Sequence, residues 1–264
     1  MIIPPINLSG AEWQYADAKP FPHVVIDGFF TDAFARELAQ EFPAFDSDAW
    51  HRYQNAIEIK RTCNDWNKMG SATYRALSFL NTPGFVELLR LSLKIDGPLY
   101  ADHGLHGGGL HAHGAGGKLN VHLDYAKHPK LGLERKINLL VYLNPDWQDE
   151  WGGALGLWEQ SPVQLGPGAL AKTIAPRFNR AVIFQTTGAW HGLPEPINCP
   201  PDQVRKSLAV YYLTEPSASC ETRSRALFAP SPDQAGNAEV LDLIRRRASE
   251  TTAADAWREA NPAA

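Results

Sequence analysis

The chain has 264 residues, of which 44% are hydrophobic and 20% charged, with a formal net charge of −4. This size fits one large globular domain or two small ones, and the acidic balance argues against a nucleic-acid-binding surface, which normally shows a basic excess. No apolar run approaches the roughly 20 residues of a membrane helix, and we expect no signal peptide because the first residues lack its basic and apolar segments. The three widely spaced cysteines form no metal-binding pattern, so we expect free thiols and a cytoplasmic location.

The first hundred residues predict one strand and two helices. A β-branched apolar run over 22–30 predicts a strand, and the segment 31–42 has apolar residues at a helical spacing of four. Pro43 ends this first helix. A second helix is expected over 84–95, where apolar residues again lie along one face.

From about residue 99 the sequence changes to short β-like runs separated by turns. The glycine-rich segment 103–117 is not a regular helix interior, since each glycine costs about 1 kcal/mol there relative to alanine. We interpret it as a loop, either a lid or a solvated connection. Five runs then predict strands, over 118–125, 136–144, 153–159, 180–186 and 206–214. With a last helix expected over 238–250, the pattern indicates one domain with a β sandwich or barrel and flanking helices.

Two potential metal ligands lie on one face of the strand predicted over 118–125. Side chains alternate between faces along a strand, so His122 and Asp124 point the same way, with Cα atoms roughly 6.5 Å apart. His128, which precedes a proline, is a poorer third ligand because the chain leaves the strand before it. The pair alone is a weak signal, because a histidine satisfied by a neighbouring carboxylate gives the same pattern.

A distant histidine strengthens the metal hypothesis. His191 follows a buried-looking strand and a turn, and on an adjacent strand it would complete a set of two histidines and one carboxylate. Such a set leaves three coordination positions open, as in non-haem Fe(II) oxygenases, whereas a closed zinc site needs a fourth protein ligand. Arg205 can hold a carboxylate through two parallel hydrogen bonds, and Tyr142 can donate its hydroxyl to the same anion. Each of these two also has a plainer interpretation, as a strand-end charge and a core aromatic residue.

Five segments form an ordered set of motifs, namely PFPHVVIDGFF (20–30), GGKLNVHLDY (116–125), RKINLLVYLNPDWQDEWGGALGLW (135–158), FQTTGAWHGLPEP (184–196) and RKSLAVYY (205–212). Together they resemble the Fe(II)- and 2-oxoglutarate-dependent dioxygenases, specifically the prolyl-hydroxylase-like branch. The resemblance implies a double-stranded β-helix with flanking helices. It also implies a single dioxygenase domain over 1–264, with N-terminal helical support over about 1–98, the β-helix core over about 99–216 and a C-terminal helical tail over about 217–264.

The resemblance further implies a role for each site residue. The implied iron ligands are His122, Asp124 and His191. Arg205 is similar to the residue that anchors the distal carboxylate of 2-oxoglutarate, and Tyr142 is similar to the tyrosine that assists it. The implied reaction uses Fe(II), 2-oxoglutarate and O2, and hydroxylates a C–H bond of a small molecule, an amino acid or a prolyl-type substrate.

The sequence departs from the family pattern in two places, one that concerns the co-substrate and one that concerns the substrate. Many relatives carry a tyrosine shortly before the first ligand, where this chain has Ala112, and the candidate replacements are His111 and His113. The residues after the DY pair, which are usually polar, are Ala126 and Lys127 here. Substrate preference is therefore not transferred from the family.

Two other functions fit the same residues. A cupin-like barrel with zinc or manganese as a Lewis acid would be a non-oxidative enzyme, and a binding module that has lost turnover would keep the barrel. Asp124 stands where halogenating relatives carry a small residue, which favours hydroxylation or an alternative outcome such as desaturation. We expect a small-molecule or peptide substrate and no nucleic-acid or membrane partner.

Overall fold

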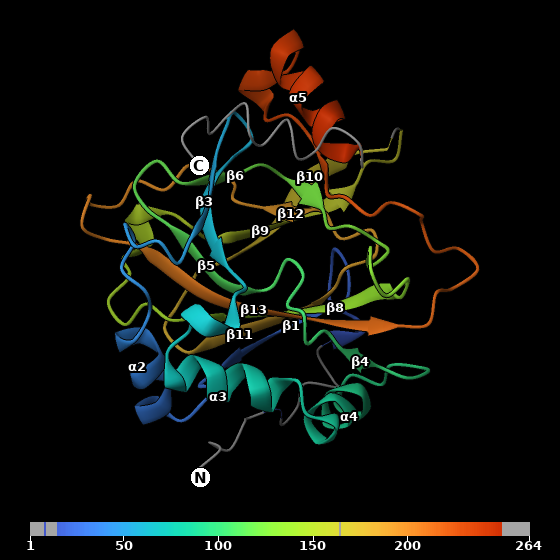
Figure 1. Ribbon diagram of the computed structural model, residues 1–264. Helices are drawn as coiled ribbons and strands as arrows, with labels where there is room; N and C mark the ends of the chain where they lie inside the picture. The colour runs from blue at the N-terminus through green and yellow to red at the C-terminus, as the bar shows by residue number, and fades with distance from the viewer. Residues whose placement is uncertain (1–7, 9–14, 164, 250–264) are drawn as a thin grey trace.

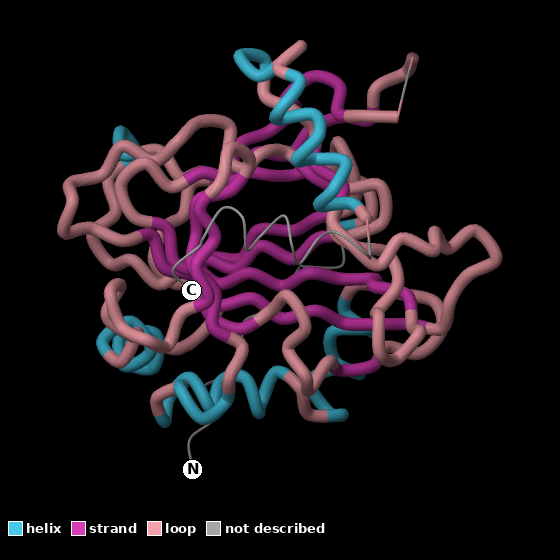
Figure 2. The backbone as a smooth tube through the Cα atoms, turned by 45° about the horizontal axis from the view of Figure 1, so that its top comes forward, coloured by secondary structure: helices cyan, strands magenta, loops and turns pink. Residues whose placement is uncertain are grey.

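Two β-sheets pack against each other at the centre of the molecule (Figures 1 and 2). The computed structural model describes residues 8, 15–163 and 165–249. Buried side chains from both sheets meet between them, among them Tyr142 from one sheet and Leu157 from the other. The site described below lies between these two layers.

The larger sheet has nine strands that come from distant parts of the chain. They are β1 (His23–Asp27), β2 (His51–Gln54), β3 (Glu58–Cys63), β4 (Tyr100–Ala101), β5 (Gly109–His113), β6 (Lys118–Leu119), β8 (Glu134–Tyr142), β11 (Arg180–Gln185) and β13 (Arg205–Thr214). Their main order is β1–β11–β8–β13–β5–β3–β2, with β4 paired to β13 and β6 paired to β3. Every pairing is antiparallel.

The smaller sheet has five strands and carries the metal-ligand candidates. They are β7 (His122–Leu123), β9 (Leu155–Gln160), β10 (Pro167–Ile174), β12 (His191–Gly192) and β14 (Leu227–Phe228). The order is β10–β9–β12–β7–β14. The β12–β7 pairing sets His191 directly opposite His122, so strand register brings together two histidines that lie nearly seventy residues apart.

Three helices cover the larger sheet on the side away from the smaller one (Figure 1). They are α2 (Asp32–Gln40), α3 (Ser71–Leu80) and α4 (Pro83–Ser92), and short 3-10 turns occur at Trp66–Lys68, Asp149–Trp151 and Pro232–Gln234. Along β8, alternation sends Val141 into the core under the helices and Tyr142 into the core between the sheets. The sheet is therefore buried on both faces, as the continuous apolar sequence of β8 requires.

The glycine-rich segment predicted as a loop contains a central strand, β5, and this part of the prediction is wrong. Gly109 has a φ of +91°, and a Cβ atom there would lie 2.1 Å from the Cys63 carbonyl oxygen. The glycine therefore permits a close approach of β5 to the end of β3, which no larger residue allows. Because glycine serves here to pack two backbones together, composition alone misidentifies the segment.

Helix α5 (Ala238–Ala248) lies at the opposite end of the molecule from α2, α3 and α4 (Figure 1). A buried ion-pair network joins it to β3. Arg247 donates to Glu58 Oε1 from Nε at 2.9 Å and from Nη2 at 2.6 Å, and Lys60 Nζ lies 3.3 Å from Glu58 Oε2. The Glu58 side chain is fully buried, so two cations balance one carboxylate inside the protein.

Replacing Glu58 with glutamine is expected to lower the free energy of unfolding by about 3 kcal/mol, because it leaves two largely buried cations without their acid. Chemical denaturation at neutral pH measures this loss. Glu195→Gln, at an exposed position, is the matched control and should have little effect. Equal stability of the Glu58 variant and the native protein would contradict the assigned role.

The pH dependence of this loss has a definite sign. Burial by itself raises the pKa of Glu58, but the charges of Lys60 and Arg247 outweigh it and hold that pKa below the usual value. A carboxylate with a lowered folded pKa stabilises the protein above its unfolded pKa of about 4.3, and the contribution is lost as pH falls through the folded pKa. The stability difference between native protein and Glu58→Gln should therefore be full at neutral pH and shrink in acid.

Most of the other predicted elements are confirmed with small shifts of their ends. The strand predicted over 22–30 is β1, and the helices predicted over 31–42 and 84–95 are α2 and α4. The strands predicted over 136–144 and 206–214 are β8 and β13. The single strand predicted over 118–125 is wrong, because the chain forms β6 in the larger sheet and then β7 in the smaller one, and β7 ends before Asp124. The first 98 residues also contribute β1, β2 and β3 to the sheet, and 217–237 contain β14 as well as a 3-10 turn. Parts of the predicted N-terminal support and helical tail, 1–7, 9–14 and 250–264, lie outside the described residues.

Two further expectations concern membranes and cysteines. Within the part of the chain that the structure describes, none of the helices has the length and apolar character that crossing a bilayer demands. Cys63, Cys199 and Cys220 are all free.

Candidate metal and co-substrate site

His122, Asp124 and His191 form a buried cluster of metal-ligand type. One potential ligand atom from each lies within 4.8 Å of the others. His122 Nε2 is 3.8 Å from Asp124 Oδ1, and His191 Nε2 is 3.8 Å from Asp124 Oδ2. The sequence prediction that a histidine on an adjacent strand meets the His-x-Asp pair agrees with this geometry.

Backbone contacts set the orientation of both imidazole rings. His122 Nδ1 lies 3.0 Å from the Asn120 carbonyl, and His191 Nδ1 lies 2.9 Å from the Ala189 carbonyl. A carbonyl oxygen only accepts, so each Nδ1 carries the proton and each Nε2 lone pair faces the carboxylate. Burial also lowers the pKa of His122 to about 3, which keeps its ring neutral and able to bind a metal.

Asp124 is held as a carboxylate. Burial by itself raises its pKa, but His191, Arg135 and His122 outweigh this and lower the pKa to about 2. Its Oδ2 atom is buried and has no hydrogen-bond partner among the described residues. Two preset nitrogen donors beside an unsatisfied carboxylate oxygen fit a divalent cation, and two imidazoles with one carboxylate suit iron with open positions.

Arg205 supplies a buried positive charge in the same cavity. It is 4% exposed, and no described carboxylate lies within ion-pair distance of it. Its Nε donates to the Gly153 carbonyl at 2.7 Å, which fixes the side chain and leaves the terminal nitrogens for another acceptor. A Cβ atom on Gly153 would lie 2.9 Å from Arg205 Cδ, so this glycine is needed for the approach. A buried guanidinium in this state calls for an anionic ligand.

Tyr142 and Lys206 take opposite positions relative to Arg205. Arg205 Cζ lies 4.8 Å from the centre of the Tyr142 ring, and the Tyr142 hydroxyl is buried without a hydrogen-bond partner among the described residues. Lys206, next in the strand, faces the other way and donates to the Ala39 carbonyl at 3.2 Å. Strand alternation thus puts Arg205 on the cavity side and removes Lys206 from it. Tyr142 lies on the same side of the sheet but is fully buried in the core between the sheets, and it is not among the residues that line the cavity.

His111 and His113 also face this cavity, which the sequence left undecided. In the β5–β13 register His113 lies opposite Arg205 and His111 opposite Ser207, whereas Ala112 belongs to the core under the helices. Their rings have three buried nitrogens without partners, namely His111 Nε2 and both nitrogens of His113. Burial is the main cause that lowers the pKa of His111 to about 3 and that of His113 well below its usual value. Two neutral imidazoles therefore stand beside Arg205 with N–H groups to donate.

The enclosing cavity has a volume of about 420 Å³ and reaches from Arg205 past the His–Asp–His cluster. His106 lines it, while His128 is buried outside the lining as a structural residue. His128 Nδ1 accepts the backbone N–H groups of Lys130 and Leu131, at 3.2 and 3.1 Å, and Nε2 faces Asp102 at 3.6 Å. His128 is thus a turn residue, as its position before Pro129 indicates.

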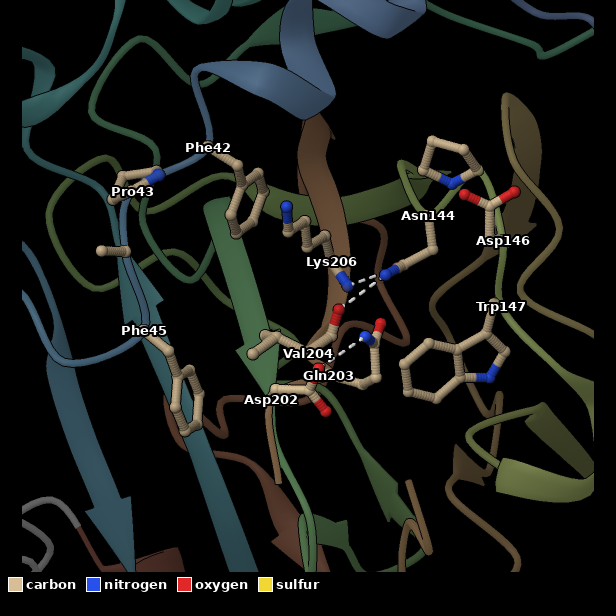
Figure 3. Close-up of a pocket in the computed structure, with 12 residues that line it drawn as sticks. Phe42, Pro43, Phe45, Asn144, Asp146, Trp147, Asp202, Gln203, Val204 and Lys206 are labelled. Carbon is tan, nitrogen blue, oxygen red and sulfur yellow. Dashed lines mark hydrogen bonds between the residues drawn. The ribbon is translucent and has the colours of Figure 1, made fainter. Parts of the chain in front are cut away.

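A second cavity, of about 320 Å³, lies on the other side of β13 (Figure 3). Phe42 and Phe45 stand on one side of it and Trp147 on the other. Its central polar groups are already paired, because Asn144 accepts from the Lys206 backbone at 2.6 Å and donates to the Val204 carbonyl at 2.6 Å. No metal-ligand cluster of described residues occurs there, so the chemistry belongs to the first cavity.

Comparison with models of known protein families shows which family this chain resembles. Residues 108–213 match the model of the 2OG-Fe(II) oxygenase superfamily, and this range includes all five residues predicted for the site. A search of curated proteins found no match.

Comparison with solved structures shows which fold this chain shares. A prolyl hydroxylase from Trichoplax adhaerens, in complex with a hypoxia inducible factor oxygen degradation domain peptide fragment, has a TM-score of 0.50 at 18% identity, over 73% of this chain and 83% of that chain. An oxidoreductase of the 2OG-Fe(II) oxygenase family from Burkholderia pseudomallei has a TM-score of 0.50 at 11% identity, over 81% and 93% of the two chains.

At these identities the structural likeness carries the fold alone, and the predicted double-stranded β-helix is confirmed. The family match adds the cofactors of the group, which are Fe(II), 2-oxoglutarate and O2. Residues 108–213 therefore belong to the 2OG-Fe(II) oxygenase superfamily, and the protein is an Fe(II)- and 2-oxoglutarate-dependent dioxygenase.

Proposed function

We propose that His122, Asp124 and His191 hold the Fe(II), and that Arg205 with Tyr142 holds the distal carboxylate of 2-oxoglutarate. One observation carries this assignment. Two oriented imidazole rings and a carboxylate share a cavity with the buried Arg205 guanidinium, which has no carboxylate partner among the described residues. His113 and His111, opposite Arg205 and Ser207, are proposed as further N–H donors to the co-substrate. They replace the tyrosine that many relatives have near Ala112.

The chain's own residues position the reactants. When bound, Fe(II) and 2-oxoglutarate would supply the electrons that activate O2, the oxidant, for hydroxylation of a C–H bond. The Asn120 and Ala189 carbonyls hold the imidazole rings in the tautomer that presents Nε2. Arg205, fixed by the Gly153 carbonyl, orients the co-substrate by its far carboxylate. Burial between two sheets keeps bulk water away from the reacting atoms.

We propose hydroxylation as the outcome, on a small molecule, an amino acid or a prolyl-type substrate. Asp124 supports it, because its carboxylate would bind the metal where a halogenating relative carries a small residue and leaves room for chloride. Residues 1–264 are proposed to form one domain, since β1, β2 and β3 share a sheet with β8 and β13 and β14 pairs with β7. The free cysteines are consistent with the proposed cytoplasmic location.

Fe(II) and 2-oxoglutarate added together to the protein under argon are expected to give a weak visible charge-transfer band. Neither reagent alone should give it, because the band belongs to the chelate of both at one metal. Zn(II) or Mn(II) in place of Fe(II) is the control and should give no such band. A protein that binds the metal but shows no band would favour the non-oxidative cupin-like enzyme, and a band without succinate formation on admitting O2 would favour a binding module.

A further inference from the structure

The catalytic cavity carries an excess of positive charge that the proposed function does not use. Five Lys or Arg side chains and two carboxylates line it within the described part of the chain. The whole chain has a net charge of −4, so this excess is local to the cavity. Buried or enclosed cations in such numbers need an anion from elsewhere.

Assigning the metal and co-substrate leaves the excess in place. The two positive charges of Fe(II) and that of Arg205 balance Asp124 and the two carboxylates of 2-oxoglutarate. Lys60, Arg135, Arg225 and Arg247 then stand against Glu58 alone. A third ligand of the cavity, the primary substrate, is the remaining source of negative charge.

Three of these four cations are already engaged. Lys60 and Arg247 both pair with Glu58. The Arg135 guanidinium is stacked between two tyrosines, with Cζ 3.3 Å from the centre of the Tyr125 ring and 3.4 Å from that of Tyr211. Arg135 also donates to the His106 carbonyl at 2.7 Å and lies 3.6 Å from Asp124 Oδ1.

Arg225 is different, because its charge has no acid partner among the residues that the structure describes. Its Nε atom is buried and makes no hydrogen bond there. Its backbone is fixed close to the metal cluster, since Arg223 Nη1 donates both to the Asp124 carbonyl at 2.6 Å and to the Arg225 carbonyl at 2.8 Å. The Arg225 charge is also among the causes, after burial, that lower the pKa of His106, so the two side chains are near each other in the cavity.

We propose that the primary substrate is a small acid whose carboxylate or phosphate is bound by Arg225 beside the iron site. This inference rests on the proposed function, because it takes the Asp124 and Arg205 positions as occupied by metal and co-substrate. A guanidinium with a free donor edge suits either anion through parallel hydrogen bonds. The volume of about 420 Å³ has to hold co-substrate and substrate together, which fits a small molecule. A prolyl residue inside a peptide has no such charge.

The test uses protein loaded with Fe(II) and 2-oxoglutarate under argon. Free L-amino acids and other small carboxylic acids, their primary amides, sugar phosphates and inorganic phosphate are each added at about 10 mM, and the change in the visible band is followed. Acids or phosphates are expected to perturb the band while the isosteric amides do not. Carboxylates and phosphates in separate arms identify which anion is bound, and an uncharged prolyl peptide tests the peptide alternative.

Variants then locate the anion site. Arg225→Gln is expected to raise the half-saturating concentration of the active acid about tenfold or more, since it removes a charge-assisted hydrogen bond. Arg225→Lys, which keeps the charge, should recover part of the affinity. Arg245→Gln removes an exposed arginine of α5, whose side chain is 75% exposed, and should leave the response unchanged.

Three results would overturn the inference. The first is a response to amides or to the neutral peptide equal to that of the acids. The second is an unaltered acid response in Arg225→Gln. The third is an unchanged visible band with every carboxylate and phosphate tested, because an unpaired guanidinium in an enclosed site should bind simple anions at millimolar concentration. In each case the band of the loaded protein is still present, whereas failure of the band itself would contradict the proposed function.

Discussion

Asp124→Ala is expected to lower 2-oxoglutarate turnover by on the order of 100-fold or more. Loss of a residue that only hydrogen-bonds to a metal ligand already costs about 10- to 100-fold, and Asp124 is itself a proposed ligand. The substitution removes one of the three proposed protein ligands, the carboxylate that faces His122 Nε2 and His191 Nε2. Succinate formation measures the activity, and Fe(II) binding measures the loss of the site itself. The fold should persist, since β7 is held by backbone pairing to β12 and β14.

The matched control for this substitution is Asp202→Ala, at an exposed position away from the cluster. It removes the same side chain and should leave both readings as in the native protein. Thermal unfolding distinguishes loss of the metal from loss of the fold. Full turnover in Asp124→Ala would refute the ligand assignment.

Arg205→Gln is expected to raise the 2-oxoglutarate concentration needed for half saturation by about 10- to 100-fold. A hydrogen bond to a charged group contributes about 1.5–3 kcal/mol, and tenfold in affinity corresponds to about 1.4 kcal/mol. The visible band under argon gives the affinity without turnover, so a binding defect is measured apart from a chemical one. Fe(II) affinity should change little, because Arg205 contacts Gly153 and Tyr142 and not the ligand cluster.

Lys206→Gln is the control for this second prediction. It removes a positive charge one residue away on the same strand, but from the opposite face, where Lys206 donates to Ala39. An unchanged 2-oxoglutarate requirement in Arg205→Gln would move the anchor to another residue. An equal effect of both substitutions would indicate a general change of the strand and not a specific clamp.

The ligand set is accessible from sequence because two of its members are close in the chain, although Asp124 lies just after the end of β7 and not within a strand. His122 and Asp124 are two residues apart, and the motif around His191 has a recognisable order in the family. Buried strands such as β8 and β13 were found because their apolar β-branched runs match a strand buried on both faces.

Other features depend on contacts that no local pattern records. β5 is not predicted because Gly109 serves a close backbone approach, and β2 and β3 are not predicted because their sequences are mostly polar. The helix α3 is not predicted although its buried residues Ala76, Leu77 and Leu80 follow helical spacing. The position of Arg225 depends on Arg223, whose Nη1 donates both to the Arg225 carbonyl and to the Asp124 carbonyl, about a hundred residues away. Such a contact appears only after the chain has folded.

The register of the smaller sheet has a consequence for how the protein matures. β7 is paired on one side with β12 and on the other with β14, and the Phe228 ring stacks on the His122 ring with centroids 5.0 Å apart. Both partners are synthesised long after β7, and closing such large loops makes native pairing slow and late. The growing chain therefore cannot assemble the proposed ligand cluster until β12 has emerged and paired with β7, and β14 then covers the His122 ring. Fe(II) bound at the proposed site would then be held by folded protein, and its binding would shift the folding equilibrium towards the native state.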